Sequence, residues 1–423
     1  MATVTSPRYK VAPRTALALL LLVFAGCLNY VDRVSLSIAH GPVKTMLGVS
    51  ETRMGGLMSI FSIAYGLAQL PVGPLSDRFG TRRVLGAGLT LWSFAQLLVA
   101  RVHSLFGFMG LRVILGVGEA PYYPASIQLI HSELAASLRA RALALVNSSA
   151  MVGQAIAPPL LTVIMLHYGW RPMFAITGAV GLVLSLIWFL LLRDRSGSPP
   201  VEDGYVAPRA TPLSLGQWAR FFSDPVIWLM MSGFAGVNYT AWFYIAWLPS
   251  YLENGRGISV AHTGWLAALP YLAATVGMHT DGWLADRLVR GGAPAPRVHV
   301  TFAMGGLFAS AVMTLLVPHV RSHVDAIALI MIAMFFLQFA GNSAWGYAQS
   351  VSPQPIVATV SSIQNFGSQV FGSLAPLLTG AILDYTHSFN AAFGLCGCIT
   401  AMGGLCYLYL WRTRVVAVHT PRA

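Results

Sequence analysis

Four ionisable residues lie inside long apolar segments, where a charged side chain is energetically costly. Asp32 and Arg33 fall in the first of these segments, and Arg112 and Glu119 fall in the fourth. A charge at the centre of a bilayer costs about 3 kcal/mol on insertion scales, so such residues usually mark an ion or substrate pathway. A carboxylate can take up a proton there, and a guanidinium can bind an anion. This residue set is therefore our best indicator of function.

The composition predicts a polytopic membrane protein. Of 423 residues, 56% are hydrophobic and only 9% are charged, whereas a soluble domain carries about a quarter charged residues. The net charge of +12 does not require a nucleic-acid partner, because the basic residues concentrate in alternate loops. The first apolar run is too long for the hydrophobic region of a signal peptide, so we expect it to be retained as a membrane span.

Twelve apolar runs are long enough to cross a bilayer, and each must be a helix because no water is available there for free backbone groups. The expected spans are residues 16–39, 54–76, 84–101, 105–130, 141–166, 171–192, 226–252, 262–285, 298–317, 324–349, 357–382 and 389–411. An even number of spans places both termini on one side. Loops on that side carry most of the Lys and Arg residues, so both termini are expected to be cytoplasmic.

A polar break and two internal repeats divide the chain into halves. The expected parts are an N-terminal six-helix bundle (1–192), a cytoplasmic linker (193–224), a C-terminal six-helix bundle (225–411) and a cytoplasmic tail (412–423). The repeats pair Gly73-Pro-Leu-Ser-Asp77-Arg78 with Gly282-Trp-Leu-Ala-Asp286-Arg287, and Pro159-Leu-Leu-Thr162 with Pro376-Leu-Leu-Thr379. They predict an all-α membrane protein whose two bundles are related by pseudo-two-fold symmetry, with a substrate site between them.

The loop after the second span also indicates a family. Its sequence, Gly73-Pro-Leu-Ser-Asp77-Arg78-Phe-Gly80-Thr-Arg82-Arg83, resembles the signature of the major facilitator superfamily. Asn29-Tyr30-Val-Asp32-Arg33 and Arg112-x6-Glu119-Ala120-Pro121 resemble its anion:cation symporter family, over essentially the whole chain. That family includes bacterial sugar-acid and aromatic-acid permeases and sialin-type carriers. The resemblance implies a transporter without cofactor or metal, in the bacterial inner membrane. A single chain suffices for this architecture, so we expect it to function as a monomer.

The loop motif is expected to act as a conformational gate. Gly73 should let a neighbouring helix approach closely. Asp77, at the cytoplasmic end of the second span, can accept hydrogen bonds from the N-terminus of the eleventh span and so hold the bundles together. Arg78, Asp286 and Arg287 complete this expected gate, and we assign the nearby Asp281 to the same helix-end motif.

The four buried charges predict a coupling mechanism. Arg112 and Glu119 are seven residues apart, so they share one helix face about 10 Å apart along the axis. Their depths predict that Asp32 pairs with Arg112, and Arg33 with Glu119. A substrate carboxylate could take over an arginine, and the acid left behind would bind a proton. Glu119 is expected to be the main proton carrier and Asp32 a second site or gate.

Other polar and aromatic residues are candidates for the wall of the substrate site. Each of them could equally have a structural role, either in helix packing or in a hydrogen bond between helices, instead of contacting the substrate. By position or by the resemblance, the candidates are Tyr30, Tyr65, Gln154, Asn342, Trp345, Ser361 and Asn365.

The leading hypothesis is proton-coupled uptake of a small organic anion, such as a sugar acid, an aromatic acid or a hydroxy acid. Efflux of cations or drugs by proton antiport is disfavoured, because two intramembrane arginines create a positive cavity. A membrane enzyme is disfavoured by the short loops, which lack metal-ligand spacing and a phosphate-binding motif. Ala125-Ser126 departs from the sugar-acid permeases, and with Tyr122 and Tyr123 it favours a less hydroxylated or aromatic acid.

Overall fold

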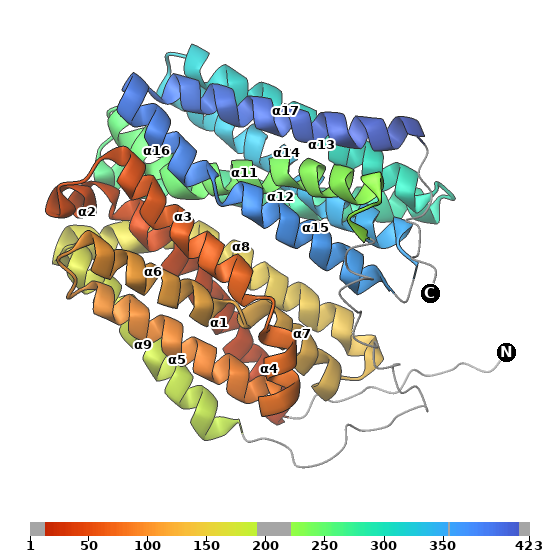
Figure 1. Cartoon of the computed structure of the whole chain (residues 1–423), viewed down its shortest axis with the longest axis horizontal. Helices are drawn as coiled ribbons and strands as arrows, with labels where there is room; N and C mark the ends of the chain where they lie inside the picture. The colour runs from red at the N-terminus through yellow and green to blue at the C-terminus, as the bar shows by residue number, and fades with distance from the viewer. Residues whose placement is uncertain (1–12, 193–220, 354–355, 414–423) are drawn as a thin grey trace.

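A computed structural model describes residues 13–192, 221–353 and 356–413, and the regular elements in these ranges are all helices (Figure 1). Most of the expected linker and of the tail lies outside the described residues, as does the side chain of Asp77. The predicted gate can therefore be followed only through its other members.

The N-terminal half contains nine helices among the described residues. They are α1 (Pro13–Ile38), α2 (His40–Leu47), α3 (Glu51–Ala68), α4 (Val72–Phe79), α5 (Thr81–Val99), α6 (Leu105–Glu119), α7 (Tyr122–Glu133), α8 (Ala136–Tyr168) and α9 (Trp170–Leu191). The second expected span is broken into α3 and α4 at Pro71, and the fourth into α6 and α7 at Pro121. Proline breaks a helix there because it lacks an N–H donor and its ring clashes with the preceding turn.

The C-terminal half is built in the same way. Its elements are α11 (Pro225–Ser250), η1 (Tyr251–Gly255), α12 (Val260–Arg290), α13 (Ala295–Leu316), η2 (Val317–His319), α14 (His323–Val351), α15 (Val357–Gly372), α16 (Ala375–Thr386) and α17 (Phe389–Thr413). The assignment of Asp281 to a helix-end motif is wrong, because α12 continues for two and a half turns beyond it, to Arg290. The short helix α2 was not expected from the sequence.

Seven helical segments of the described chain are individually long and apolar enough to cross a membrane. The other crossings contain proline breaks or more polar and aromatic residues. The two halves also repeat one packing pattern: α1 packs on α8 and α5 on α6 and α9, while α11 packs on α15 and α13 on α14 and α17. The twelve crossings thus form two six-helix bundles with pseudo-two-fold symmetry, as predicted, and Figure 1 shows the bundles side by side.

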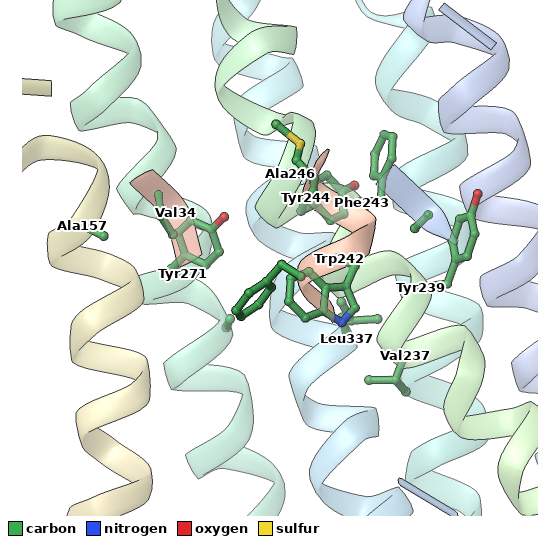
Figure 2. Packing of buried hydrophobic residues seen from close by; sticks show 14 of the residues in the cluster. Val34, Ala157, Val237, Tyr239, Trp242, Phe243, Tyr244, Ala246, Tyr271 and Leu337 are labelled. Carbon is green, nitrogen blue, oxygen red and sulfur yellow. The ribbon is translucent and has the colours of Figure 1, made fainter. Parts of the chain in front are cut away.

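The two bundles share one apolar core and meet through helix pairs that the symmetry exchanges, α3 with α16 and α8 with α12. Figure 2 shows part of this core, which includes Val34 of the first bundle and Tyr271 of the second. Glycine permits the closest approaches. A Cβ atom on Gly55 would collide with the carbonyl oxygen of Pro376, and one on Gly380 with that of Glu51.

These close approaches lie on the side of the bundles opposite the start of α1 and the end of α17, which we call the distal side, and we call the opposite one the terminal side. The expectation that Gly73 permits a close helix approach is wrong for this arrangement. A Cβ atom on Gly73 would meet no heavy atom within 4 Å. The physical reason is that Gly73 lies in the first turn of the separate helix α4 on the terminal side, whereas the bundles converge at the other end of the span.

A carboxylate from one bundle caps a helix of the other on the distal side. Asp384, near the end of α16, accepts hydrogen bonds from the backbone N–H groups of Glu51 (2.9 Å) and Thr52 (2.8 Å) and from the Thr52 hydroxyl (2.5 Å). Because α3 begins at Glu51, these N–H groups have no partner within their own helix. Desolvation acts to raise the pKa of Asp384, but the hydrogen bonds from Thr52 and Glu51 outweigh it and hold the pKa at about 2.

We expect Asp384→Asn to loosen the distal side, because an amide in place of the carboxylate turns an N–H group toward these donors. A cysteine replacing Ser59, which lies at the α3–α16 contact and accepts from the N–H of Leu377 (3.1 Å), reports the opening in a background without the native cysteines. Its reaction with a membrane-impermeant maleimide should be several-fold faster in the Asp384→Asn variant.

The exposed acid Asp325 at the start of α14 provides a matched control, and Asp325→Asn should leave the labelling rate unchanged. The lowered pKa of Asp384 means that the cap is fully present above the ordinary Asp pKa of about 3.9 and is lost as pH falls toward 2. The labelling rate of the Asp384 protein relative to that of the Asp384→Asn variant should therefore be constant between about pH 8 and pH 5, because the pH dependence of thiolate formation is common to both proteins. Equal rates for the two Asn variants would refute the capping role.

Candidate functional site

The predicted pair of Arg33 and Glu119 is present. Arg33 projects from α1 toward the end of α6, where its Nε lies 2.8 Å from Oε2 of Glu119. The Glu119 carboxylate is fully buried, whereas 8% of the Arg33 side chain remains exposed. The guanidinium is thus the more accessible partner of this ion pair.

Aromatic rings contact both guanidinium groups. Cζ of Arg33 lies 4.8 Å from the ring centroid of Tyr30 and 4.5 Å from that of Tyr65. Phe61, one turn before Tyr65 in α3, lies 5.5 Å from Cζ of Arg33 and 4.7 Å from Cζ of Arg112. Such contacts stabilise a desolvated cation through the quadrupole of the ring. Phe61 was missed in the sequence, although its i, i+4 spacing from Tyr65 places both on one helix face.

Asp32 faces in another direction. Successive residues of a helix point about 100° apart, and Asp32 has Gln96 of α5 and Thr177 of α9 as polar neighbours. The charges of Glu119 and Arg112 also act on it, although neither forms an ion pair with it. Its predicted ion pair with Arg112 is not formed, since no such pair lies within 4.0 Å among the described residues. Direct pairing of these two residues is therefore a wrong prediction.

The buried charges carry polar atoms that lack hydrogen-bond partners in the described part of the chain. A buried donor or acceptor without a partner costs about 1–3 kcal/mol, so native structures contain few of them. Around the ion pair they are Nδ2 and Oδ1 of Asn29, both carboxylate oxygens of Asp32, Nε and Nη1 of Arg112, and Oε1 of Glu119. The arrangement can donate to an anion through Arg112 and can bind protons on Asp32 and Glu119.

The remaining predicted wall residues lie elsewhere. Asn342 donates to Asp281, the ring of Trp345 packs on Phe234 at a centroid distance of 5.6 Å, and the buried hydroxyl of Ser361 has no partner in the described chain. Gln154 is buried in α8 and Asn365 is half-buried in α15. No hydrogen bond or ring contact between described residues joins these five to the four charges.

The terminal side holds the residues of the expected gate. Arg78, Asp286 and Arg287 are exposed. A partner that sequence analysis missed is Glu133 at the end of α7, which forms a mostly buried ion pair with Arg82 of the loop motif. Among the described residues, no group of three His, Cys, Asp or Glu side chains is placed to hold a metal ion.

The tyrosines that favoured an aromatic substrate have other roles or surroundings. The Tyr122 hydroxyl donates to the carbonyl oxygen of Leu22 at 3.0 Å, so it ties α7 to α1. Tyr123 is 40% exposed. Ser126 turns its hydroxyl back onto the carbonyl oxygen of Tyr122 at 2.6 Å. These residues therefore give no structural support to the preference for an aromatic acid.

Comparison with known proteins gives matches over nearly the whole chain. The sequence profile described as Major Facilitator Superfamily matches residues 22–376. The "Probable L-galactonate transporter" of Escherichia coli (strain K12) is 42% identical over 412 residues, which cover 96% of this chain and 90% of that protein. The "D-galactonate transporter" of Escherichia coli O6:H1 is 29% identical, with 94% and 95% covered.

Two solved structures show a similar fold. A bacterial homologue of the human lysosomal transporter Spinster, in an inward-facing and unoccupied conformation, aligns with a TM-score of 0.79 at 19% identity and covers 96% of this chain and 98% of its own. The D-xylose–proton symporter aligns with a TM-score of 0.72 at 16% identity, with 95% and 98% covered.

Removing one partner of the central ion pair should destabilise the protein strongly. We expect Arg33→Leu to cost about 3–5 kcal/mol, because it leaves the Glu119 carboxylate buried without its counterion. The measurement is the apparent melting temperature of the detergent-solubilised protein. Arg33→Leu/Glu119→Leu should recover much of the loss, while Arg53→Leu at an exposed position should change little. A double variant no more stable than Arg33→Leu would contradict the pairing.

Proposed function

The chain belongs to the Major Facilitator Superfamily, and we propose that it takes up a polyhydroxylated organic acid together with protons. The protein is a multi-pass membrane transporter and not an enzyme. The observation that carries the proposal is the buried Arg33–Glu119 pair, surrounded by donors and acceptors that have no partner in the described protein. Such a site has binding capacity for both an anion and a proton.

The coupling follows from the cost of burying charge. A substrate carboxylate that binds the free Nε and Nη1 donors of Arg112 also competes with Glu119 for the accessible guanidinium of Arg33. A carboxylate buried without its counterion is far less costly when neutral, so Glu119 then binds a proton. Substrate and proton thereby enter together, and Asp32 serves as the second protonatable group.

A sugar acid fits this site better than an aromatic acid. The relatives that match nearly the whole chain are named for galactonate, and the tyrosine that favoured an aromatic acid is engaged in packing. The guanidinium groups bind the carboxylate, and polar residues such as Asn342 and Asn365 in the other bundle are available for hydroxyl groups.

Proton-antiport efflux of a cation is less well supported. Asp32 and Glu119 are both completely buried, whereas Arg33 keeps 9% of its surface exposed. A cation entering this region would therefore meet a positive group before reaching a carboxylate, which disfavours its binding.

Topology and direction follow from the distribution of basic residues. We propose that the terminal side is cytoplasmic in a bacterial inner membrane, following the excess of Lys and Arg in the loops of that side. The converged distal side, with the Asp384 cap, is then periplasmic. The site is contained in one chain, so a monomer suffices for transport.

Glu119→Gln should abolish accumulation of galactonate against its gradient in proteoliposomes that carry a pH gradient. Gln keeps the shape of Glu119 but cannot exchange a proton, so substrate movement loses its driving force. Exchange of labelled for unlabelled substrate at equal concentrations should survive, because it needs no net proton transfer. Asp325→Asn should behave as wild type. Continued proton-driven accumulation by Glu119→Gln would rule out this residue as the coupling group.

Binding itself should discriminate between substrate classes. We expect L-galactonate or D-galactonate, but neither galactose nor a primary amine of similar size, to raise the melting temperature of the solubilised protein. A ligand at 100 times its Kd adds about 2.7 kcal/mol of stability. Arg112→Gln should remove the effect and Arg53→Gln should retain it. Stabilisation by amines alone would instead favour cation efflux.

A further inference from the structure

A third buried carboxylate lies in the C-terminal bundle, apart from the four central charges. Asp281 of α12 is completely buried. Its Oδ2 accepts from Nδ2 of Asn342 at 2.7 Å, and its Oδ1 accepts from Oγ of Ser343 at 2.5 Å. No Lys or Arg of the described chain forms an ion pair with it. A carboxylate held only by neutral donors in a membrane span is costly, so stability alone does not account for it.

Asp281 differs from Asp32 and Glu119 in its hydrogen bonding. Both Asp32 oxygens and one Glu119 oxygen lack partners among described residues, whereas each Asp281 oxygen is engaged by its own donor from α14. Both oxygens of this carboxylate are thus tied to α14 by a hydrogen bond. Its arrangement is that of a group that fixes the orientation of its neighbours.

The residue whose orientation matters is Asn342. An amide is planar and rigid, so donation from Nδ2 to Asp281 fixes the direction of Oδ1 as well. That oxygen has no hydrogen-bond partner in the described structure and is not sealed from solvent. Gln338 lies one turn earlier on the same face of α14, and its Nε2 reaches Sδ of Met151 in the first bundle at 3.8 Å. The face that carries Asn342 is therefore the face directed at the first bundle.

We infer that Asp281 is a positioning residue for substrate recognition, which holds Asn342 so that Oδ1 accepts a hydrogen bond from a substrate hydroxyl group. This inference rests on the proposed function, with the substrate carboxylate at the arginines of the first bundle and its hydroxyl chain reaching the second. An oriented acceptor favours a hydroxyl group and disfavours a second carboxylate. An analogue without hydroxyl groups leaves that acceptor unpaired, which is an effective means of discrimination.

The test compares galactonate uptake kinetics in proteoliposomes with competition by hexanoate, a six-carbon acid without hydroxyl groups. Asp281→Asn should raise the KM for galactonate roughly three- to tenfold, the value of one lost hydrogen bond, with Vmax unchanged. Asn342→Ala should raise it by a similar factor, and the double variant by no more than Asn342→Ala alone. The inhibition constant of hexanoate should be the same in every variant.

Ser343→Ala is the matched control. It removes one hydrogen bond from Asp281 but leaves the bond to Asn342, so the KM should stay near the wild-type value. If Asp281→Asn does not fold, Asp281→Glu tests the same point, because its longer side chain displaces the Asn342 amide and should also raise the KM.

Three results would overturn the inference while leaving the proposed function intact. The first is a wild-type KM for galactonate in the Asp281 variants. The second is a double variant in which the KM increases of Asp281→Asn and Asn342→Ala multiply. The third is reduced proton-driven accumulation by the Asp281 variants with an unchanged KM. The last result would make Asp281 a proton carrier. Failure of the wild-type protein to take up or bind galactonate would instead overturn the proposed function, and this inference with it.

Discussion

The buried ion pair of Arg33 and Glu119 is the interaction on which the rest of the site depends. Two charges removed from water remain stable only while each supplies the other's electrostatic partner. The pair joins α1 to α6 at 2.8 Å. Loss of either partner leaves the other charge buried without a counterion, which is energetically unfavourable unless another group replaces it. In the proposed mechanism, an anion and a proton together provide that compensation.

The aromatic residues extend this constraint to the second bundle. Phe61 contacts both guanidinium groups and also packs edge-on against Trp242 of α11, with ring centroids 6.0 Å apart. Trp242 in turn donates to Oε1 of Gln369 in α15 at 3.2 Å. A change at the arginines can therefore be transmitted through packed rings to helices of the other half. This contiguous contact is a physical route for coupling binding to bundle movement.

The architecture and the central pair could be predicted because they depend on local patterns. Span length, internal repeats and the i, i+7 spacing of Arg112 and Glu119 are all visible in the sequence. The direction of Asp32 could not be predicted, since it depends on the rotation of α1 against α5 and α9. The position of Asp281 was misjudged because it lies close to the loop motif at Asp286, which suggested that it stands at a helix end. In the structure, α12 continues to Arg290. The cap at Asp384 joins residues more than 300 positions apart, and no local signal indicates such a contact.

The break at Pro121 has an electrostatic consequence for the carboxylate beside it. Because α6 ends at Glu119, the negative end of that helix's macrodipole lies at the carboxylate. The tenth crossing, its counterpart by symmetry, is the unbroken α14 and creates no comparable field inside its bundle. The break thus places backbone dipoles of both signs beside Glu119, the carbonyl end of α6 and the N–H end of α7, so the anionic form depends on Arg33. In the proposed mechanism, release of that arginine leaves neutralisation of Glu119 as the low-energy course, and the two otherwise similar halves divide the work between charge transfer and hydroxyl recognition.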